Sequence, residues 1–497
     1  MKILLKSIVF LSVVFTYFLN NINAQTTIIY DIVLSGGRVI DPETKLDAIR
    51  NVGIIQHQIA AITTEPLKGK EIINVSGLVV SPGFIDMHVH GRSNKEQEFQ
   101  LHDGLTTTLE LEWGIEFLKH WYASRESKAL INYGASVCWP FERYRAMRKY
   151  NDKVQQFYQS SLNSESSLEN LFNTIGASYT DSLSQEETNK MLSNIHESLT
   201  EGGIGIGLPI GYLPKNNPGE ILRVYQLAAE KKALIFSHVR EASVMGIQEA
   251  LADAMLTGAS LHIVHINSMA LSKVQLALNM IDMANKKGFD ISTEMYPYTA
   301  ASTLLQSAIF NEGWQEKLGM KYEDLQWVAT GERLTKETFE VYRKSGGAVI
   351  MHMMKPEWIK IGLANPMTMI ASDGMPYAPM AHPRTAGTFS RILGKYVREE
   401  KVIDLITAIG KMSYLPAKRL ESIAPSMHHK GRLQIGADAD ISIFNPNTIT
   451  DKASFETGLA FSEGMEYVLV NGKIVLKNGK TLSNTFPGQP IYGKFKK

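Results

Sequence analysis

Histidine and carboxylate side chains stand at the ends of several short apolar runs in this sequence. His88 and His90 close the run GFIDMHVH, and the two-residue period of a strand places both side chains on one face. Three further runs, ALIFSH, SLHIVH and MTMIASD, end in His238, His265 and Asp373. A single histidine at a strand end is usually a packing residue, but ligand-type residues at equivalent places on separate strands indicate a metal site.

The run TTTLELEW adds two carboxylates to this set. Glu110 and Glu112 share one face of the predicted strand, and Glu112 is closer to its end. We therefore favour Glu112 as a metal ligand and keep Glu110 as the second candidate. Asp86 lies deeper in its strand and is treated as structural, and His262 differs in parity from the ligand His265 and is expected to face away.

Imidazole and carboxylate ligands without a thiolate suit zinc or another divalent first-row ion. Six ligands exceed the four positions of one tetrahedral zinc, so a carboxylate that bridges two ions is the simplest arrangement. The sequence therefore predicts a site for one or two divalent metal ions, with Zn²⁺ as the first choice. Such an ion activates water and polarises a carbonyl group, which is the chemistry of hydrolysis.

These residues need elements that bring the strand ends together. Helical patterns alternate with short apolar runs: GEILRVYQLAAEKK precedes ALIFSH, GIQEALADAMLTG precedes SLHIVH, and SKVQLALNMIDMANKKG precedes FDISTEMYP. The later runs GGAVIMH and PMTMIASD fit the same series. This alternation predicts parallel βα units in a closed (β/α)8 TIM-like barrel, in which the carboxyl ends of the strands meet at one face. A doubly wound open sheet is the alternative.

Both ends of the chain have a different sequence pattern. Short runs rich in Val and Ile are separated by turn signals such as VNGK and KNGK. We expect one small β-sandwich built from residues 25–82 and 426–497, although two unrelated β-appendages would have the same pattern. The barrel then occupies residues 83–425, with an insertion at about 303–347 that could cover its mouth. The 497-residue length accommodates both units.

The first 24 residues have the pattern of a secretory signal peptide, with Lys2 and Lys6 before a short apolar run and a small residue, Ala24, at the expected cleavage point. An uncleaved membrane anchor is the alternative. We expect an exported protein, periplasmic or secreted, without stable membrane insertion. The near-equal numbers of basic (51) and acidic (50) residues disfavour nucleic acid as a partner. The sequence makes no prediction of oligomeric state.

The motif SPGFIDMHVH resembles the first metal motif of the amidohydrolase superfamily. The segments DGLTTTLELEWG, FSHVREAS, STEMYPYTAAST, MIASDGMP, HPRTAGTFSRILGKYVRE and GRLQIGADADISIFNP are together similar to the N-acyl-D-amino-acid deacylases, or D-aminoacylases, over nearly the whole mature chain. The resemblance implies a (β/α)8 barrel with a β-sandwich from both chain ends. It implies one metal position at His88 and His90, another at His238 and His265, and Asp373 as acid/base. It also implies substrate-binding roles for Tyr296, Ser302 and Arg384.

The sequence departs from this family at two positions. The family has a cysteine ligand just before the glycine of the third motif, where this chain has Trp113. Cys138, the only cysteine, is too far along the chain to replace it, so the resemblance leaves this role to Glu112. The family lysine two residues after the last metal histidine is Asn267 here, which removes one cation from carboxylate recognition.

The sequence therefore predicts a metal-dependent hydrolase of linear amides that deacylates N-acyl-D-amino acids, with a small-molecule substrate. A cyclic amide or dipeptide hydrolase, such as a hydantoinase, dihydroorotase or isoaspartyl dipeptidase, is the alternative on the same fold. Those enzymes typically bridge two metals with a carboxylated lysine, and no lysine ends a predicted strand here. The third interpretation is a secreted binding protein whose barrel has lost catalytic activity, because a fold does not determine function.

Overall fold

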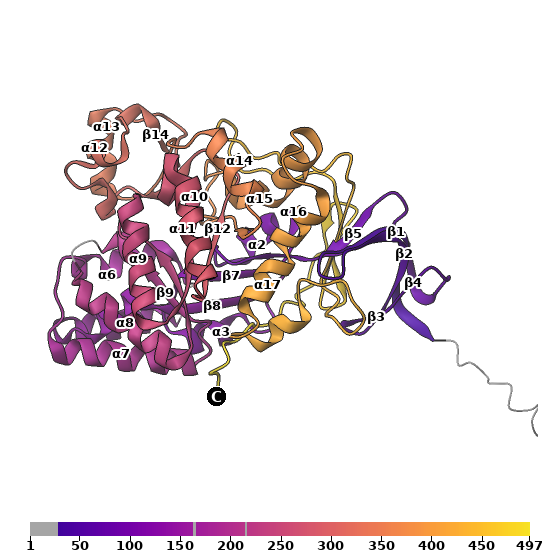
Figure 1. Cartoon of the computed structure of the whole chain (residues 1–497), viewed down its shortest axis with the longest axis horizontal. Coiled ribbons are helices and arrows are strands. Elements are labelled where there is room, and N and C mark those ends of the chain that lie inside the picture. Colours follow the sequence, from indigo (N-terminus) through magenta and orange to yellow (C-terminus); the bar gives the residue numbers. More distant parts are fainter. Residues whose placement is uncertain (1–27, 163–165, 214–215) are drawn as a thin grey trace, which may run out of the picture.

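The computed structural model describes residues 28–162, 166–213 and 216–497 (Figure 1). The predicted signal peptide, residues 1–24, lies outside this part of the chain. No helix in the described part is long and apolar enough to cross a membrane.

Eight parallel strands form the central sheet, in the order β16-β12-β11-β10-β9-β8-β7-β6. Most of these strands are buried along their whole length, as expected for a parallel sheet that is covered on both faces. Their bounds are β6 Phe84–Asp86, β7 Leu105–Ile115, β8 Asn132–Cys138, β9 Ile206–Pro209, β10 Leu234–His238, β11 Ser260–Ile263, β12 Ile291–Met295 and β16 Thr368–Ile370.

The two outer strands of this sheet approach each other through the segments that follow them. The carboxylate of Asp86 accepts a hydrogen bond from the backbone N–H of Ser372 (3.1 Å), and the N–H of His90 donates to the carbonyl of Gly374 (2.7 Å). Val89 and Gly374 also form a parallel bridge. The sheet is therefore a nearly closed barrel. Asp86 links its two outer strands, which agrees with the structural role expected for this residue.

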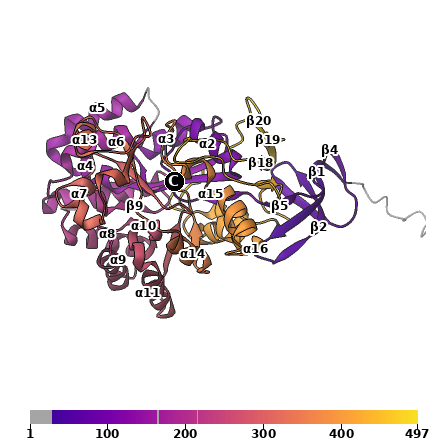
Figure 2. The same ribbon diagram turned by 90° about the horizontal axis from the view of Figure 1, so that it is seen from above.

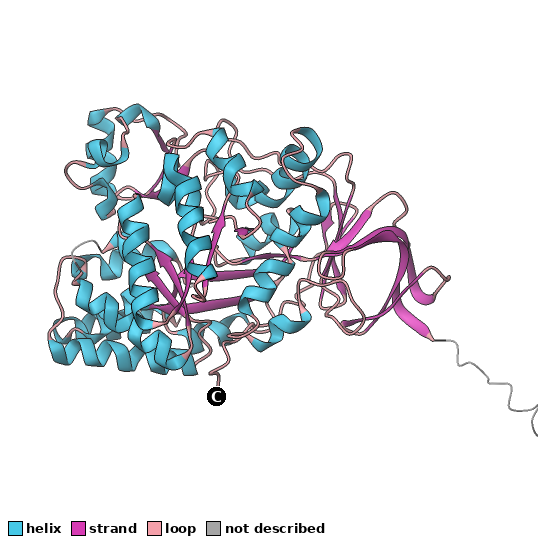
Figure 3. Ribbon diagram, viewed as in Figure 1, coloured by secondary structure: helices cyan, strands magenta, loops and turns pink. Residues whose placement is uncertain are grey.

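Helices surround the barrel strands (Figure 3). Their ends follow local signals, as in α9 (Val244–Thr257), where the Ser243 side chain caps the first turn and Gly258 ends the helix at φ 75°. The other helices next to the barrel are α2 Asn94–His102, α3 Leu118–Arg125, α4 Trp139–Ala146, α5 Asn151–Ser161, α6 Leu168–Ile175, α7 Gln185–Thr200, α8 Pro218–Lys231, α10 Ile266–Ala270, α11 Val274–Lys286, α14 Pro356–Ala364, α15 Arg384–Arg391, α16 Leu405–Met412 and α17 Tyr414–Leu420.

Both chain ends contribute to a second, nine-stranded sheet, in which β5 pairs with β17 in antiparallel register. Figure 2 shows β18, β19 and β20 of the chain end close to β5 of the chain start. This sheet has a core of its own that includes Leu34, Val52 and Leu469. Its strands are β1 Ile29–Asp41, β2 Leu46–Ile55, β3 Gln58–Thr63, β4 Lys68–Asn74, β5 Val79–Pro82, β17 Ile441–Phe444, β18 Met465–Val470, β19 Lys473–Lys477 and β20 Lys480–Thr481. The predicted fold class is confirmed, and the residue limits of the two domains stay a prediction.

A third sheet lies outside the barrel and corrects one expectation. The run AVIM, expected to be a parallel barrel strand, forms β15 (Ala348–Met351), which pairs antiparallel with β13 (Ala301–Leu304) and β14 (Leu325–Trp327). These strands share a small core with α12 (Trp314–Leu318) and α13 (Lys336–Ser345), at the top of Figure 1. A short apolar run does not specify which sheet it joins, because its buried side chains satisfy either environment.

Candidate metal and substrate site

The carboxylate of Glu112 lies at the centre of the predicted ligand set. Its Oε2 atom is 3.2 Å from Nε2 of His88 and 3.1 Å from Nε2 of His90. Its Oε1 atom is 3.4 Å from Nε2 of His265, and a ligand atom of His238 lies within 4.8 Å of ligand atoms of Glu112 and His265. All five side chains are buried. The structure therefore groups both predicted histidine pairs around one carboxylate.

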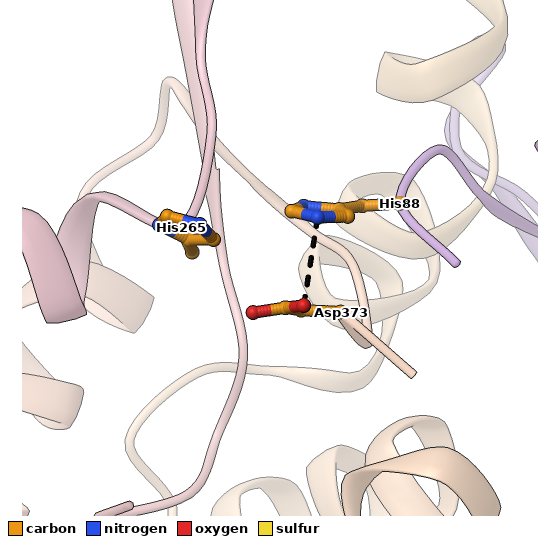
Figure 4. A group of neighbouring side chains, drawn as sticks. All are labelled: His88, His265 and Asp373. Atoms are coloured by element: carbon orange, nitrogen blue, oxygen red, sulfur yellow. Dashed lines mark ion pairs between the residues drawn. The ribbon is translucent and has the colours of Figure 1, made fainter. Parts of the chain in front are cut away.

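Asp373 follows β16 and completes this group. Its Oδ1 atom is 3.5 Å from Nε2 of His88 and 3.2 Å from Nε2 of His90, and Figure 4 shows its carboxylate facing His88 next to His265. Asp373 and His265 both have left-handed backbone angles, with φ 52° and 31°. Such angles are uncommon outside glycine and cluster at functional sites, where surrounding contacts hold them. Here the two residues with these angles are the ones whose side chains turn into the barrel mouth.

The four histidines share one orientation, with Nδ1 turned away from Glu112 and bonded to a separate group. The Nδ1 partners are Glu294 for His88 (2.5 Å), Glu110 for His90 (3.0 Å), the Val239 carbonyl for His238 (2.9 Å) and the Ser268 hydroxyl for His265 (3.1 Å). A carboxylate or carbonyl on Nδ1 accepts its proton, which leaves the lone pair on Nε2. The rings of His88, His90 and His238 are therefore set to present Nε2 to a metal ion.

The two carboxylates of the LELE run have different positions. Glu110, the second candidate ligand, contacts His90 from the Nδ1 side and is 3.7 Å from the guanidinium of Arg92. Its other oxygen accepts the backbone N–H of Trp113 (3.2 Å). Glu110 thus lies behind the ring of His90, and only Glu112 reaches the Nε2 atoms.

Sequence reasoning missed Glu294, which belongs to β12. Besides His88, its carboxylate contacts Nε2 of His262 (3.2 Å) and the backbone N–H of His265 (3.3 Å). Burial opposes its negative charge, but His88 and His262 hold the pKa of Glu294 below its ordinary value. His262 therefore supports Glu294 and does not reach the ligand group. A signal was present, because Glu294 stands near the end of the run FDISTEMYP, as the other site residues stand in theirs.

A bulge in β7 places Glu112. The register between β7 and β8 shifts between Glu110, opposite Ala135, and Ile115, opposite Val137. Gly114 lies in this bulge at φ 72°, and a β-carbon there would be 2.6 Å from the carbonyl oxygen of Ser136. Only glycine fits this backbone, so the sequence LELEWG holds both the ligand and the turn that directs it.

The three predicted substrate-binding residues lie together beside Asp373. The guanidinium of Arg384, the first residue of α15, is 2.9 Å from Asp373 and 4.6 Å from the ring centre of Tyr296. Among the described residues, Nε and Nη1 of Arg384 and the hydroxyl of Tyr296 have no hydrogen-bond partner, although all are buried. The hydroxyl of Ser302 donates to the carbonyl of Val349 (3.0 Å). Arg384 and Tyr296 therefore retain free donors for a ligand, whereas the Ser302 proton is already in use.

The donor atoms fit a divalent ion. His88, His90 and Glu112 form one group of ligand atoms within 4.8 Å, and Glu112, His238 and His265 form another. The two groups share Glu112, whose oxygens face one histidine pair and the ring of His265. Nitrogen and oxygen donors in this arrangement suit zinc, and a shared carboxylate suits a bridge between two ions.

Comparison with known proteins finds relatives that cover most of this chain. No family model matches the chain. The chain is 28% identical to D-aminoacylase from Alcaligenes xylosoxydans xylosoxydans, covering 89% of this chain and 94% of that protein. It is also 28% identical to N-acyl-D-glutamate deacylase from the same organism, covering 89% and 93%. A dihydroorotase from Syntrophus aciditrophicus is 24% identical over 84% of this chain and 89% of that protein.

Solved structures show the same fold. N-acyl-D-glutamate deacylase from Bordetella bronchiseptica, complexed with zinc and a phosphonate inhibitor, superposes with a TM-score of 0.77 at 23% identity, covering 94% of this chain and 100% of that chain. A D-aminoacylase studied for its binuclear metal centre has a TM-score of 0.77 at 22% identity, with the same coverage. A D-hydantoinase is more distant, with a TM-score of 0.59 at 15% identity over 94% of this chain and 100% of that chain. The predicted resemblance is confirmed: this chain has the fold of the D-aminoacylase group of amidohydrolases and resembles that group over nearly its whole length.

Proposed function

We propose that this protein is a metal-dependent hydrolase that removes the acyl group from N-acyl-D-amino acids. The observation that carries the proposal is the juxtaposition of Glu112, shared by two histidine pairs, with Asp373 and Arg384. Glu112 and the two histidine pairs have the donor atoms to bind metal ions, and Arg384 has free hydrogen-bond donors for a carboxylate. The relatives named D-aminoacylase and N-acyl-D-glutamate deacylase support the linear amide and the D configuration.

Each residue of the site has its own role in the proposed amide hydrolysis. A divalent ion held by the histidines and Glu112 would supply water of lowered pKa and polarise the scissile carbonyl. Asp373 accepts the proton of the attacking water and returns it to the leaving nitrogen. The hydroxyl of Tyr296 donates to the oxygen on which negative charge develops. Arg384 pairs with the carboxylate of the substrate through the guanidinium donors that its contact with Asp373 leaves free.

The first test is metal content, measured by elemental analysis of purified residues 25–497, together with amine release from matched N-acetyl-D- and N-acetyl-L-amino acids. Near-stoichiometric or higher zinc with release from the D series supports the proposal. Metal without release from either series contradicts deacylation and favours the cyclic-amide or dipeptide reading. Absence of both metal and activity favours a binding protein whose barrel has lost catalytic activity.

The alternative hydrolases have a specific observation behind them, since relatives include dihydroorotases and structural neighbours include D-hydantoinase. Against them, Glu112 occupies the centre of the ligand group. None of the eight barrel strands in the described part of the chain contains a lysine that could take its place. Dihydroorotate and hydantoin in the same substrate panel separate the readings.

Replacement of Arg384 tests the carboxylate anchor. We expect Arg384→Ala to raise KM for N-acetyl-D-amino acids by about 10-fold to 100-fold, because a charged hydrogen-bonded pair is lost. The corresponding amino-acid amides lack the carboxylate, so their KM should change far less. Steady-state kinetics on both substrate types measure the difference, and an equal effect on both would remove Arg384 from carboxylate binding.

We further propose that the protein is exported, on the basis of the basic and apolar pattern in residues 1–24. Mass spectrometry of the mature N-terminus after expression with the native leader tests this. A start at residue 25 supports export with cleavage, and an intact Met1 contradicts it.

A further inference from the structure

Arg92 is a buried cation two residues after His90, and it takes no part in the proposed chemistry. Its Nη1 atom donates to the carboxylate of Glu116 (3.1 Å) and to the hydroxyl of Ser166 (2.7 Å). Its Nη2 atom donates to the backbone carbonyl of Gly114 (3.0 Å). Both terminal nitrogens of the guanidinium therefore contact the last part of β7 or the residue that follows it, where the bulge lies.

Two backbone groups of this bulge are bonded to buried side chains. The N–H of Trp113 donates to the carboxylate of Glu110 (3.2 Å), and the carbonyl of Gly114 accepts from Arg92. The register between β7 and β8 is interrupted here, and buried backbone groups need hydrogen-bond partners. Glu112 lies between these two bonded positions, so the direction of its side chain depends on both contacts.

Arg92 also connects the bulge with a histidine of the ligand group. The guanidinium is 3.7 Å from the carboxylate of Glu110, which contacts Nδ1 of His90 (3.0 Å). On the other side of this ring, Nε2 of His90 is 3.1 Å from Oε2 of Glu112. One guanidinium thus contacts the carboxylate behind the His90 ring and the backbone that follows Glu112.

We infer that Arg92 is a positioning residue of the metal site, which holds Glu112 in place relative to His90 through the bulge and Glu110. The inference rests on the proposed function, since it takes Glu112 and the histidines as metal ligands. Arginine suits this role, because its planar guanidinium presents several donors in fixed directions at once. Without these donors the carbonyl of Gly114 would be buried and unpaired, and the bulge would relax.

The contacts of Arg92 also stabilise the fold, so a test has to separate positioning from folding. Arg92 and Glu116 are both buried, and removal of one partner of a buried ion pair is destabilising. Arg143 offers a matched comparison, because it is also buried, pairs with Glu220 (2.9 Å) and donates to two backbone carbonyls. Its partners belong neither to the ligand group nor to the bulge.

The test measures the zinc affinity of the full mature chain, residues 25–497, by competition with a chelator. We expect Arg92→Met to weaken zinc binding by about 10-fold to 100-fold, because the ligands lose their support. Arg143→Met should lower the midpoint of urea unfolding to a similar extent and keep the zinc affinity of the wild type.

Three results would contradict these expectations. Wild-type zinc affinity in Arg92→Met overturns the inference while the proposed function stands. Equal losses of affinity in Arg92→Met and Arg143→Met also overturn it, because the effect would then follow from destabilisation alone. A wild-type protein that binds no zinc contradicts the proposed function itself.

Arg92→Lys provides a milder variant, which keeps the positive charge beside Glu110 and Glu116 if Arg92→Met does not fold. A single amine cannot reproduce the directions of the guanidinium donors toward Glu116 and the Gly114 carbonyl. We therefore expect zinc binding to be weakened by about 5-fold or more. Wild-type affinity in Arg92→Lys would assign the effect to charge and overturn the positioning role.

Cobalt(II) in place of zinc reports whether the change occurs at Glu112, because the visible spectrum of this ion depends on the number and geometry of its ligands. We expect the spectrum of Arg92→Lys to differ from that of the wild type in the same direction as the spectrum of Glu112→Gln. Arg143→Met should have the wild-type spectrum. A wild-type spectrum for Arg92→Lys would show that Glu112 keeps its position without the guanidinium.

Discussion

The orientation of the four site histidines depends on groups that are not themselves ligands. Two of these groups are buried carboxylates, Glu110 behind His90 and Glu294 behind His88. A carboxylate on Nδ1 fixes the tautomer and increases the basicity of the opposite nitrogen, so these contacts affect metal affinity without touching the metal.

Replacement of Glu294 tests this contribution. We expect Glu294→Gln to weaken zinc binding by about 10-fold to 100-fold, because a neutral amide holds the His88 ring less firmly. Competition with a chelator measures the affinity directly. Glu142→Gln is the control, since Glu142 is equally buried but hydrogen-bonds Ser198 (2.7 Å) away from the site. Equal zinc affinity in both variants would leave Glu294 a purely structural residue.

Asp373 is the residue whose loss should separate catalysis from metal binding. Burial opposes its charge, but Arg384 and His88 hold the pKa of Asp373 below its ordinary value, so it is ionised and able to accept a proton at neutral pH. Asp373→Asn should reduce kcat for amide hydrolysis by about 1,000-fold. Zinc content by elemental analysis should stay close to that of the wild type, because Glu112 and the histidines remain. Wild-type turnover would refute the assigned proton acceptor.

At the scale of elements, β7 shows how a strand irregularity serves the site. A regular strand would continue its alternation through LELEWG, whereas the bulge at Gly114 turns the chain immediately after Glu112. The position of the bulge could be suspected from the glycine after the two carboxylates, but its effect on the direction of Glu112 required the neighbouring strand.

Gly114→Ala should therefore damage both stability and metal binding. The left-handed angle and the close approach to Ser136 predict a loss of about 2–4 kcal/mol in the free energy of unfolding, with weaker zinc binding. Urea unfolding and chelator competition measure the two effects. Gly258→Ala is matched, since φ is 75° there but a β-carbon meets nothing within 4 Å, so it should cost about 1 kcal/mol and leave zinc affinity unchanged. If both variants bind zinc alike, the bulge does not position Glu112.

The whole molecule shows which parts of the fold and site follow from sequence and which do not. Strand-end residues such as His238 and Asp373 could be placed because parallel strands bring their carboxyl ends to one face. The place of Glu294 near a strand end is visible in the sequence, but its role is not, since that role depends on the orientation of a ring from another strand. The sequence predicts a barrel strand at Ala348–Met351, which instead pairs antiparallel with β13, because a short apolar run does not specify the sheet that it joins.

Contact between the barrel and the chain end makes stability depend on pH. His102, the last residue of α2, stacks on Phe461 with ring centres 4.0 Å apart and contacts the hydroxyl of Thr481 in β20 (3.0 Å). Burial lowers the pKa of His102 to about 4. The unfolded chain binds a proton near pH 6.5 and the folded chain does not. The stability contributed by this residue is therefore full above about pH 6.5 and is lost as the pH falls towards 4.

Replacement of His102 should remove this dependence. We expect His102→Gln to be less stable than the wild type at pH 7.5, because the stacking contact with Phe461 is lost. Between pH 6.5 and 4.5 the wild type should lose about 1 kcal/mol more unfolding free energy than the variant, since glutamine takes up no proton. Urea unfolding across this range measures both curves, and His57→Gln, at an exposed position, should run parallel to the wild type. Parallel curves for His102→Gln and the wild type would mean that the buried ring accepts its proton as readily as the unfolded chain, and would place the pH sensitivity of the fold elsewhere.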